Sequence, residues 1–202
     1  MKYRLAIFDM DGTLTEELLD FPAIRRDIGI SGPGGIIEHI AQLNPEGRKR
    51  AMEILDRHEC AAAETCGLNE GALHVVATLR EKGIKTALLT RNSAQSVRRV
   101  FARHGLALDH ISSRENAPHK PHPDSILNIT RKFAIDPRQT LMIGDYLYDL
   151  QAAQAAGADS VLLLDPNDPT PDWAHLATYR IHHLRDLLKI VEPSPTTSHL
   201  TK

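Results

Sequence analysis

Two aspartates stand two residues apart just after the first apolar segment of the sequence. Asp9 and Asp11 follow residues 3–8, and Gly12 comes next. Side chains two apart on an extended chain point the same way, so both carboxylates are expected at the carboxyl end of one strand. Gly12 can adopt backbone angles closed to other residues, which would let the chain turn sharply away. Two acids this close repel unless a proton or a cation separates them, which indicates a bound metal ion.

Two further segments place polar residues beside a predicted strand or helix. Thr90, Arg91 and Asn92 close the apolar run 85–90. The Thr90 hydroxyl and the next backbone N–H can bind oxygens of an anion, although a threonine in this position is often only a helix cap. Lys120 precedes a proline ahead of a predicted helix. Its ammonium group can bind anionic oxygens, although alone it would be interpreted as a surface lysine.

A second pair of acids follows the apolar run 140–144. Asp145 and Asp149 are four residues apart in the string GDYLYD. At a strand end, Asp145 can reach a metal ion shared with Asp9, while Asp149 lies one helical turn further on and can orient a metal-bound water or a neighbouring donor. An acid pair that opens a helix often only offsets the helix dipole. The Asp145 and Asp149 pair therefore indicates a functional site only in combination with the other polar motifs.

Short apolar runs alternate with helical periodicity along most of the sequence. Strands are predicted at residues 3–8, 85–90, 140–144 and 160–164. Helices are predicted at residues 93–104, 123–133 and 149–156. This order predicts an α/β fold with a parallel sheet and right-handed crossovers.

One stretch, residues 16–68, interrupts that alternation. It has helical segments around 22–28 and 45–66 and a turn cluster at 31–35, but no convincing strand. We therefore expect a small all-helical cap inserted after the first strand, with residues 1–15 and 69–191 as the α/β core. The tail 192–202 is polar and contains prolines, which is typical of disorder.

Composition excludes several classes of function. The 202 residues suffice for one sizeable domain with an insertion, and a net charge of -2 disfavours a nucleic-acid partner. No apolar stretch approaches the roughly 20 residues that span a bilayer, and the start of the sequence does not resemble a signal peptide. We therefore expect a cytoplasmic protein with no membrane partner. Cys60 and Cys66 have a spacing that fits neither a redox pair nor a zinc site.

Together, the polar motifs resemble those of the haloacid dehalogenase superfamily, whose first motif is DxDGT(L/V) at the end of the first strand. The string DMDGTL matches it, and Thr90, Lys120 and the GDxxxD pair match the three later motifs in order. The resemblance covers residues 2 to about 164, in particular to phosphoglycolate phosphatase-like members with a small helical cap. Many such members carry DGTLxD, whereas this chain has Glu16 and Glu17 after Thr15. The resemblance therefore does not extend to the segment that enters the cap.

The resemblance implies a Rossmann-like core and a magnesium-dependent phosphatase that hydrolyses small phosphomonoesters, similar to phosphoglycolate or sugar phosphates. Asp9 would be the nucleophile that forms an aspartyl phosphate, and Asp11 the general acid and then base. The implied catalytic residues are Asp9, Asp11 and Lys120, and the implied substrate-binding residues are Thr90, Arg91, Asn92 and Lys120. Magnesium would be held by Asp9, the Asp11 carbonyl and Asp145, supported by Gly12 and Asp149.

Two other functions stay open: a phosphosugar mutase of the beta-phosphoglucomutase type and a non-catalytic phosphate-binding module. The presence of Asp11 disfavours dehalogenation, because dehalogenating members lack an acid there. We expect a small-molecule phosphate ester as the partner and a monomer or homodimer. Candidate cap residues for a second polar or anionic substrate group are Arg25, Arg26, Arg57 and His58.

Overall fold

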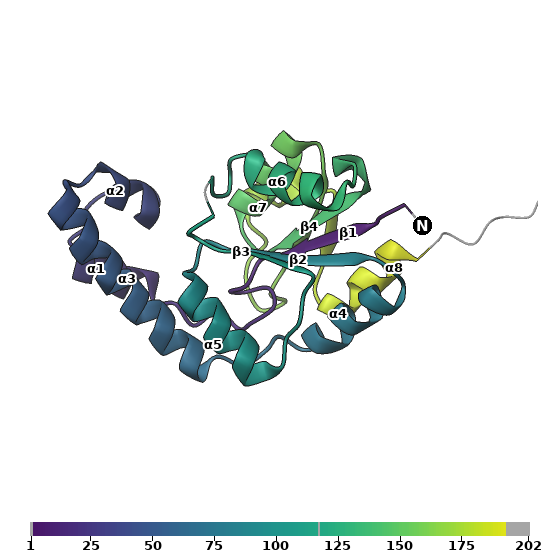
Figure 1. The fold of residues 1–202 in the computed structure, drawn as a ribbon, viewed down its shortest axis with the longest axis horizontal. Coiled ribbons are helices and arrows are strands. Elements are labelled where there is room, and N and C mark those ends of the chain that lie inside the picture. The colour runs from purple at the N-terminus through teal and green to yellow at the C-terminus, as the bar shows by residue number, and fades with distance from the viewer. Residues whose placement is uncertain (1, 117, 193–202) are drawn as a thin grey trace, which may run out of the picture.

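The protein is described by a computed structural model that covers residues 2–116 and 118–192. Six parallel strands form one sheet in the order β3-β2-β1-β4-β5-β6 (Figure 1). Their bounds are β1 Leu5–Phe8, β2 Lys85–Leu89, β3 His110–Ser112, β4 Thr140–Gly144, β5 Asp159–Leu163 and β6 Tyr179–Ile181. The predicted α/β class with a parallel sheet is confirmed. The expectation of a disordered tail falls almost entirely on residues 193–202, outside the described part of the chain.

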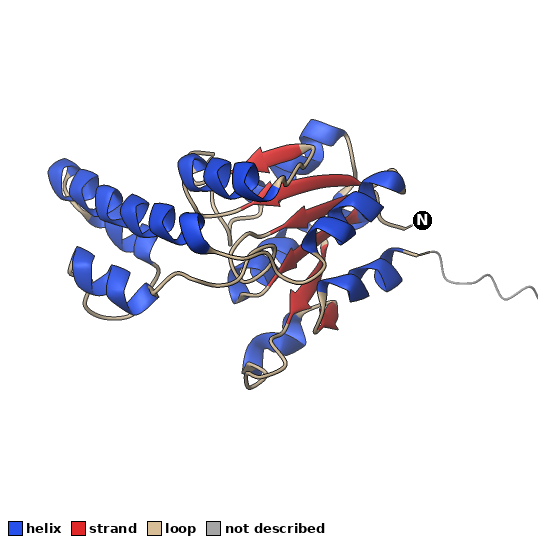
Figure 2. Ribbon diagram, turned by 90° about the horizontal axis from the view of Figure 1, so that it is seen from below, coloured by secondary structure: helices blue, strands red, loops and turns tan. Residues whose placement is uncertain are grey.

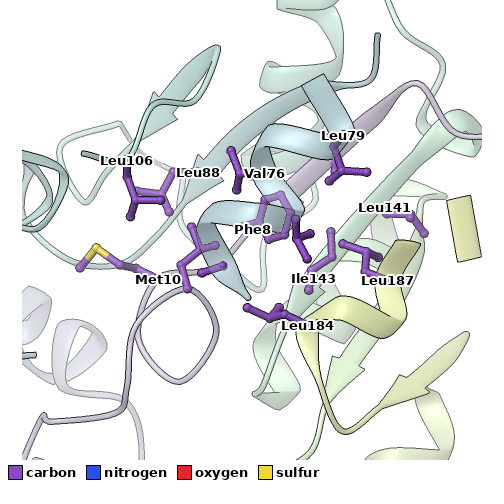
Figure 3. Packing of buried hydrophobic residues seen from close by; sticks show 14 of the residues in the cluster. Phe8, Met10, Val76, Leu79, Leu88, Leu106, Leu141, Ile143, Leu184 and Leu187 are labelled. Atoms are coloured by element: carbon purple, nitrogen blue, oxygen red, sulfur yellow. The ribbon is translucent and has the colours of Figure 1, made fainter. Parts of the chain in front are cut away.

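Alternate residues of the central strand β1 serve the two faces of the sheet, as the two-residue period of a strand requires. Phe8 packs in one apolar cluster with Leu79 and Leu187, whereas Ile7 packs in another with Ile126. Figure 3 shows the first cluster, in which Phe8 lies among Val76, Leu79, Ile143 and Leu184. Burial on both faces explains why β1 and β4 are continuous apolar runs without a polar alternation.

Helices cover both faces of the sheet. The first face is covered by α4 (Ala72–Glu81), α5 (Ala94–His104) and α8 (Leu187–Val191), and the second by α6 (Asp124–Phe133) and α7 (Leu147–Ala156) (Figure 1). Short 3-10 segments are η1 (Pro137–Gln139), η2 (Asp172–Leu176) and η3 (Leu184–Asp186). The predicted start of α7 at residue 149 is wrong by two residues, because the helix begins at Leu147.

Four helices lie between β1 and β2, and the three that precede α4 are α1 (Phe21–Ile28), α2 (Ile36–Gln42) and α3 (Pro45–Thr65). Residues 16–68, called the lid from here on, extend to one side of the sheet and consist of helices and loops (Figures 1 and 2). The lid has its own small core of Ile24, Ile40, Ala51 and Leu55. Its limits at residues 16 and 68 stay a prediction.

The lid is joined to the core by two chain segments that lie side by side. The Glu16 N–H donates to the Gly67 carbonyl at 3.1 Å, and the Gly67 N–H donates to the Glu16 carboxylate at 3.1 Å. Thr15 and Leu68 form an antiparallel bridge directly beside them. The glutamate that departs from the family pattern therefore ties the entry of the lid to its exit.

No helix in the described ranges combines the length and the apolar content that crossing a membrane would need. Even the longest, α3, carries charged residues along its length. Cys60 is half-buried and Cys66 is buried, and both are free thiols.

The loop after β1 is held by hydrogen bonds within itself and by one side chain from outside. The Met10 carbonyl accepts from the N–H groups of Leu14 and Thr15, each at 2.9 Å, and Gly12 has φ +70°. Asn69 Nδ2 donates to the carbonyls of Gly12, Thr13 and Thr15 at 3.0, 2.9 and 3.2 Å. A residue just beyond the lid thus fixes the loop that bears Asp9 and Asp11.

We expect Asn69→Ala to lower the free energy of unfolding by about 1–3 kcal/mol, because loop carbonyls would lose their donor. Urea unfolding followed by circular dichroism measures this. Asn128→Ala is the matched control, since Asn128 is an exposed residue of α6 whose side chain accepts one bond from Arg131. Equal losses of stability in the two variants would contradict the assigned role of Asn69.

Candidate active site

Three carboxylates meet at the carboxyl edge of the sheet. Asp9 follows β1 and Asp145 follows β4, and these strands are neighbours with Phe8 level with Ile143. Asp149 lies in the first turn of α7. One oxygen from each of Asp9, Asp145 and Asp149 lies within 4.8 Å of the others. Carboxylate oxygens in such a cluster are the ligands that magnesium prefers, so these residues fit a divalent cation.

Asp145 is positioned by the loop after β1. Thr13 Oγ1 donates to Asp145 Oδ1 at 2.9 Å. A Cβ atom at Gly12 would collide with the Asp145 carboxylate, and the positive φ of this residue also favours glycine. Gly12 is therefore required both for the turn and for the close approach of the two segments.

Lys120 is buried between two of these carboxylates. Its Nζ atom is 2.8 Å from Asp9 Oδ1 and 2.6 Å from Asp149 Oδ1, and its side chain is 3% exposed. Burial alone would lower the pKa of Lys120, but the charges of Asp149 and Asp9 raise it above its usual value. The ammonium group thus stays charged between the two carboxylates. Asp149 also accepts from the Tyr146 N–H at 3.2 Å, so it orients the lysine from a fixed position.

Burial and the crowding of acids raise the pKa values of Asp145 and Asp11. Burial raises the pKa of Asp145 well above its usual value, and the charges of Asp9 and Asp149 add to this. The pKa of Asp11 rises to about 7, first through burial and then through the charges of Asp9 and Glu59. A bound cation would oppose these shifts, because it stabilises the ionised forms.

The carboxylate of Asp11 turns toward a different partner from the other acids. Asn92 Nδ2 donates to Asp11 Oδ2 at 2.7 Å. The three carboxylates that lie close enough to share one cation are those of Asp9, Asp145 and Asp149. The Asp11 side chain is not among them. This arrangement leaves Asp11 facing the cavity as a proton donor or acceptor, and its service as a metal ligand through the carbonyl stays a prediction.

The segment after β2 brings Thr90 to the same edge. Thr90 is buried, and its Oγ1 atom accepts from the Asn92 N–H at 3.2 Å. The cap of α5 is Ser93, whose hydroxyl accepts from the Ser96 N–H. Thr90 is thereby free of the capping role that a threonine in this position often has.

Arg91 and Arg25 are both held by lid groups. The Arg91 guanidinium contacts both Glu38 carboxylate oxygens at 2.6 and 2.7 Å and lies over the Tyr148 ring at 5.0 Å. Arg25 donates to the carbonyls of Gly32 and Gly34. Arg91 therefore ties the core to α2, a use of its side chain that was not predicted.

The other lid candidates for substrate contact lie elsewhere. His58 Nε2 lies 2.9 Å from Asp27 Oδ2, and Arg26 is exposed. Arg57 lines a separate, shallow surface hollow. Among the four basic lid residues considered from the sequence, Arg25 is the one that lines the main cavity.

Sequence reasoning missed a buried ion pair between lid and core. Glu59 of α3 is 2% exposed, pairs with Arg114, and accepts from the Ser93 N–H at 2.9 Å. Arg114 also contacts Asp56 and donates to the Arg91 carbonyl at 3.3 Å. A signal was present in the sequence, because Glu59 stands four residues after the apolar Leu55 on one helical face.

A single cavity of about 490 Å³ unites these groups. It lies between lid and sheet edge and contains eight of the nine predicted site residues: Asp9, Asp11, Thr90, Arg91, Asn92, Lys120, Asp145 and Asp149. The ninth, Gly12, is not part of the cavity lining and packs against the Asp145 carboxylate. The Asp9 carboxylate, the buried Lys120 ammonium group and the acids that could hold a cation thus border one cavity.

Comparison with known proteins gives the same family as the motifs. Residues 3–157 match the haloacid dehalogenase-like hydrolases. A haloacid dehalogenase-like hydrolase domain-containing protein of Arabidopsis thaliana is 31% identical, over 85% of this chain and 75% of that protein. An N-acetylmuramic acid 6-phosphate phosphatase of Pseudomonas aeruginosa is 24% identical, over 95% of this chain and 96% of that protein.

The fold recurs in a crystal structure of a predicted phosphoglycolate phosphatase from Haemophilus somnus. That structure has a TM-score of 0.74 at 20% identity and covers 95% of this chain and 99% of its own. The family match includes all four polar motifs and more than half of the chain. This chain therefore belongs to the haloacid dehalogenase-like hydrolase family.

Proposed function

We propose that this chain is a magnesium-dependent phosphatase that hydrolyses small phosphomonoesters through a phosphorylated Asp9. The observation that carries the proposal is the setting of Asp9, which lies 2.8 Å from the buried Lys120 ammonium and within reach of a cation shared with Asp145 and Asp149. Phosphoryl transfer needs such positive charge around the transferred oxygens more than it needs covalent chemistry. The name of the Pseudomonas aeruginosa relative supports the same reaction class.

Asp9 would attack phosphorus in line and displace the alcohol of the substrate, which forms an acyl phosphate on the carboxylate. Lys120 would hold an equatorial phosphoryl oxygen while it keeps Asp9 oriented. Thr90 and the Arg91 N–H, at the end of β2, would bind the remaining oxygens. Every one of these groups borders the same cavity.

Asp11 would protonate the leaving alkoxide and then accept a proton from the water that hydrolyses the acyl phosphate. Burial and neighbouring charges raise the pKa of Asp11 to about 7 without a bound cation, which favours the protonated form that the first of these tasks needs. Asn92 holds the carboxylate in place through the bond at 2.7 Å.

A magnesium ion held by Asp9, Asp145 and the Asp11 carbonyl would supply positive charge to the phosphoryl oxygens. Asp149 would serve mainly through Lys120, to which it is bound at 2.6 Å. In this proposal residues 1–15 and 69–191 form the catalytic core. The lid covers the cavity and selects the alcohol part of the substrate.

We expect Asp9→Asn to lower kcat on 4-nitrophenyl phosphate, with magnesium, by about a thousandfold or more, because an amide is a poor nucleophile. Beryllium fluoride should form a stable adduct with the wild type and not with the variant, which fluorine NMR detects. Asp168→Asn, in an exposed loop, is the control and should keep the activity. Activity that survives in Asp9→Asn would refute the assigned nucleophile.

The raised acid pKa values predict that the metal-free protein loses stability as the pH rises. Asp11 has a pKa of about 7 instead of 3.8, so between these values the folded chain binds more protons than the unfolded chain. Burial and neighbouring charges raise the pKa of Asp145 as well. We expect Tm without metal to be several degrees lower at about pH 8 than at about pH 5.5.

Magnesium should restore this loss at about pH 8 and change Tm less at about pH 5.5, where protons compete for the same oxygens. Asp145→Asn should raise Tm without metal at the higher pH, because it removes one repelling charge, and should remove most of the magnesium effect. Differential scanning fluorimetry on both proteins, with Asp168→Asn beside them, measures this. A Tm that is independent of pH and magnesium in the wild type would contradict the shared cation site.

A further inference from the structure

We propose that the preferred substrate carries an uncharged, largely apolar alcohol, and that the lid discriminates against phosphomonoesters with a second anionic group. The inference rests on the proposed phosphatase function and names the substrate class of that same site. It is carried by the composition of the lid side of the cavity and by the partners of its basic side chains.

Apolar side chains form the wall that faces the catalytic acids. The lid contributes residues from three separate segments: Leu19, Phe21, Ile36, Ile37 and Leu55. Phe21 is 43% exposed. The Tyr148 ring adds a flat surface from α7. An alcohol with a ring or a branched chain would bury apolar area here, which stabilises its complex.

Every basic side chain at this cavity, within the described residues, already has partners. Lys120 lies between Asp9 and Asp149. Arg91 is held by both oxygens of Glu38, by the Lys120 carbonyl at 3.3 Å and by the face of Tyr148.

Arg25 donates to two carbonyls of the glycine-rich turn, Gly32 and Gly34. A second anion on the substrate would therefore meet donors that are already in use, because Arg91 is paired with a carboxylate and the Arg25 guanidinium is held in the glycine-rich turn by two carbonyls.

Two lid carboxylates border the same space and would repel such an anion. Glu17 lies at the entry segment of the lid, and Glu59 lies on α3 with its charge shared with Arg114. A carboxylate moved from water to this wall would lose hydration and would meet only donors that already have partners, which is unfavourable. Phosphoglycolate, which the sequence resemblance favours, carries such a carboxylate, so this wall disfavours it.

Three synthetic substrates test the inference because their alcohols have similar acidity and differ in size and charge: methyl, benzyl and 4-carboxybenzyl phosphate. With magnesium, we expect kcat/KM for benzyl phosphate to exceed that for each of the others by about tenfold or more. Phosphate release measured over a range of substrate concentrations gives these values. Asp9→Asn runs beside each assay to show that the hydrolysis belongs to this site.

Glu38→Gln tests the role of the paired arginine. Loss of the Glu38 charge leaves Arg91 with a net positive charge at the cavity. The rate on 4-carboxybenzyl phosphate relative to benzyl phosphate should therefore rise about threefold or more. Glu46→Gln, on the exposed start of α3, is the matched control and should leave this ratio unchanged.

The outcomes separate the inference from the function on which it rests. Hydrolysis of 4-carboxybenzyl or methyl phosphate as fast as benzyl phosphate, with loss in Asp9→Asn, overturns the inference and leaves the phosphatase function intact. The same holds if 4-nitrophenyl phosphate is hydrolysed and none of the three is accepted. Failure on 4-nitrophenyl phosphate as well overturns the proposed function, and the inference with it.

Discussion

Negative charge gathered at one edge of the sheet is the constraint on which the other features depend. Asp9, Asp11, Asp145 and Asp149 converge there, and the Lys120 ammonium group lies between two of them. Carboxylates this close are costly without compensation, since burial and mutual repulsion both oppose ionisation. The site is thus built at the expense of stability, as active sites commonly are. A divalent cation is the natural complement to this arrangement.

The parallel sheet explains how residues far apart in sequence reach one place. β1 and β4 are neighbours, so the residues that follow them emerge side by side at the same edge. The loop after β1 must then turn away at once, which Gly12 permits and Asn69 secures with three hydrogen bonds. Catalytic geometry here is a property of the strand order and of one reinforced turn.

The sequence predicted what is local and strongly patterned. The runs that became β1, β2, β4 and β5 are apolar because both of their faces are buried, so they were found within two residues. β3 and β6 have three residues each at or near the sheet edges, too short for a pattern to develop. α2 was not predicted because it is short and follows a glycine-rich turn, and its N-cap, Gly35, has no side chain that would indicate the start of a helix.

Contacts between distant segments were invisible in the sequence: Glu59 with Arg114 spans 55 residues, and Arg91 with Glu38 spans 53. These two ion pairs give the lid two attachments of unequal strength. Separating Glu59 from Arg114 would strand charges inside the protein, at a cost of about 3–5 kcal/mol. The Glu38 to Arg91 pair is far more accessible to water and typical of contacts worth about 1 kcal/mol or less. α3 is consequently the firmer attachment of the lid to the core, and the contact through α2 is the one that costs less free energy to break.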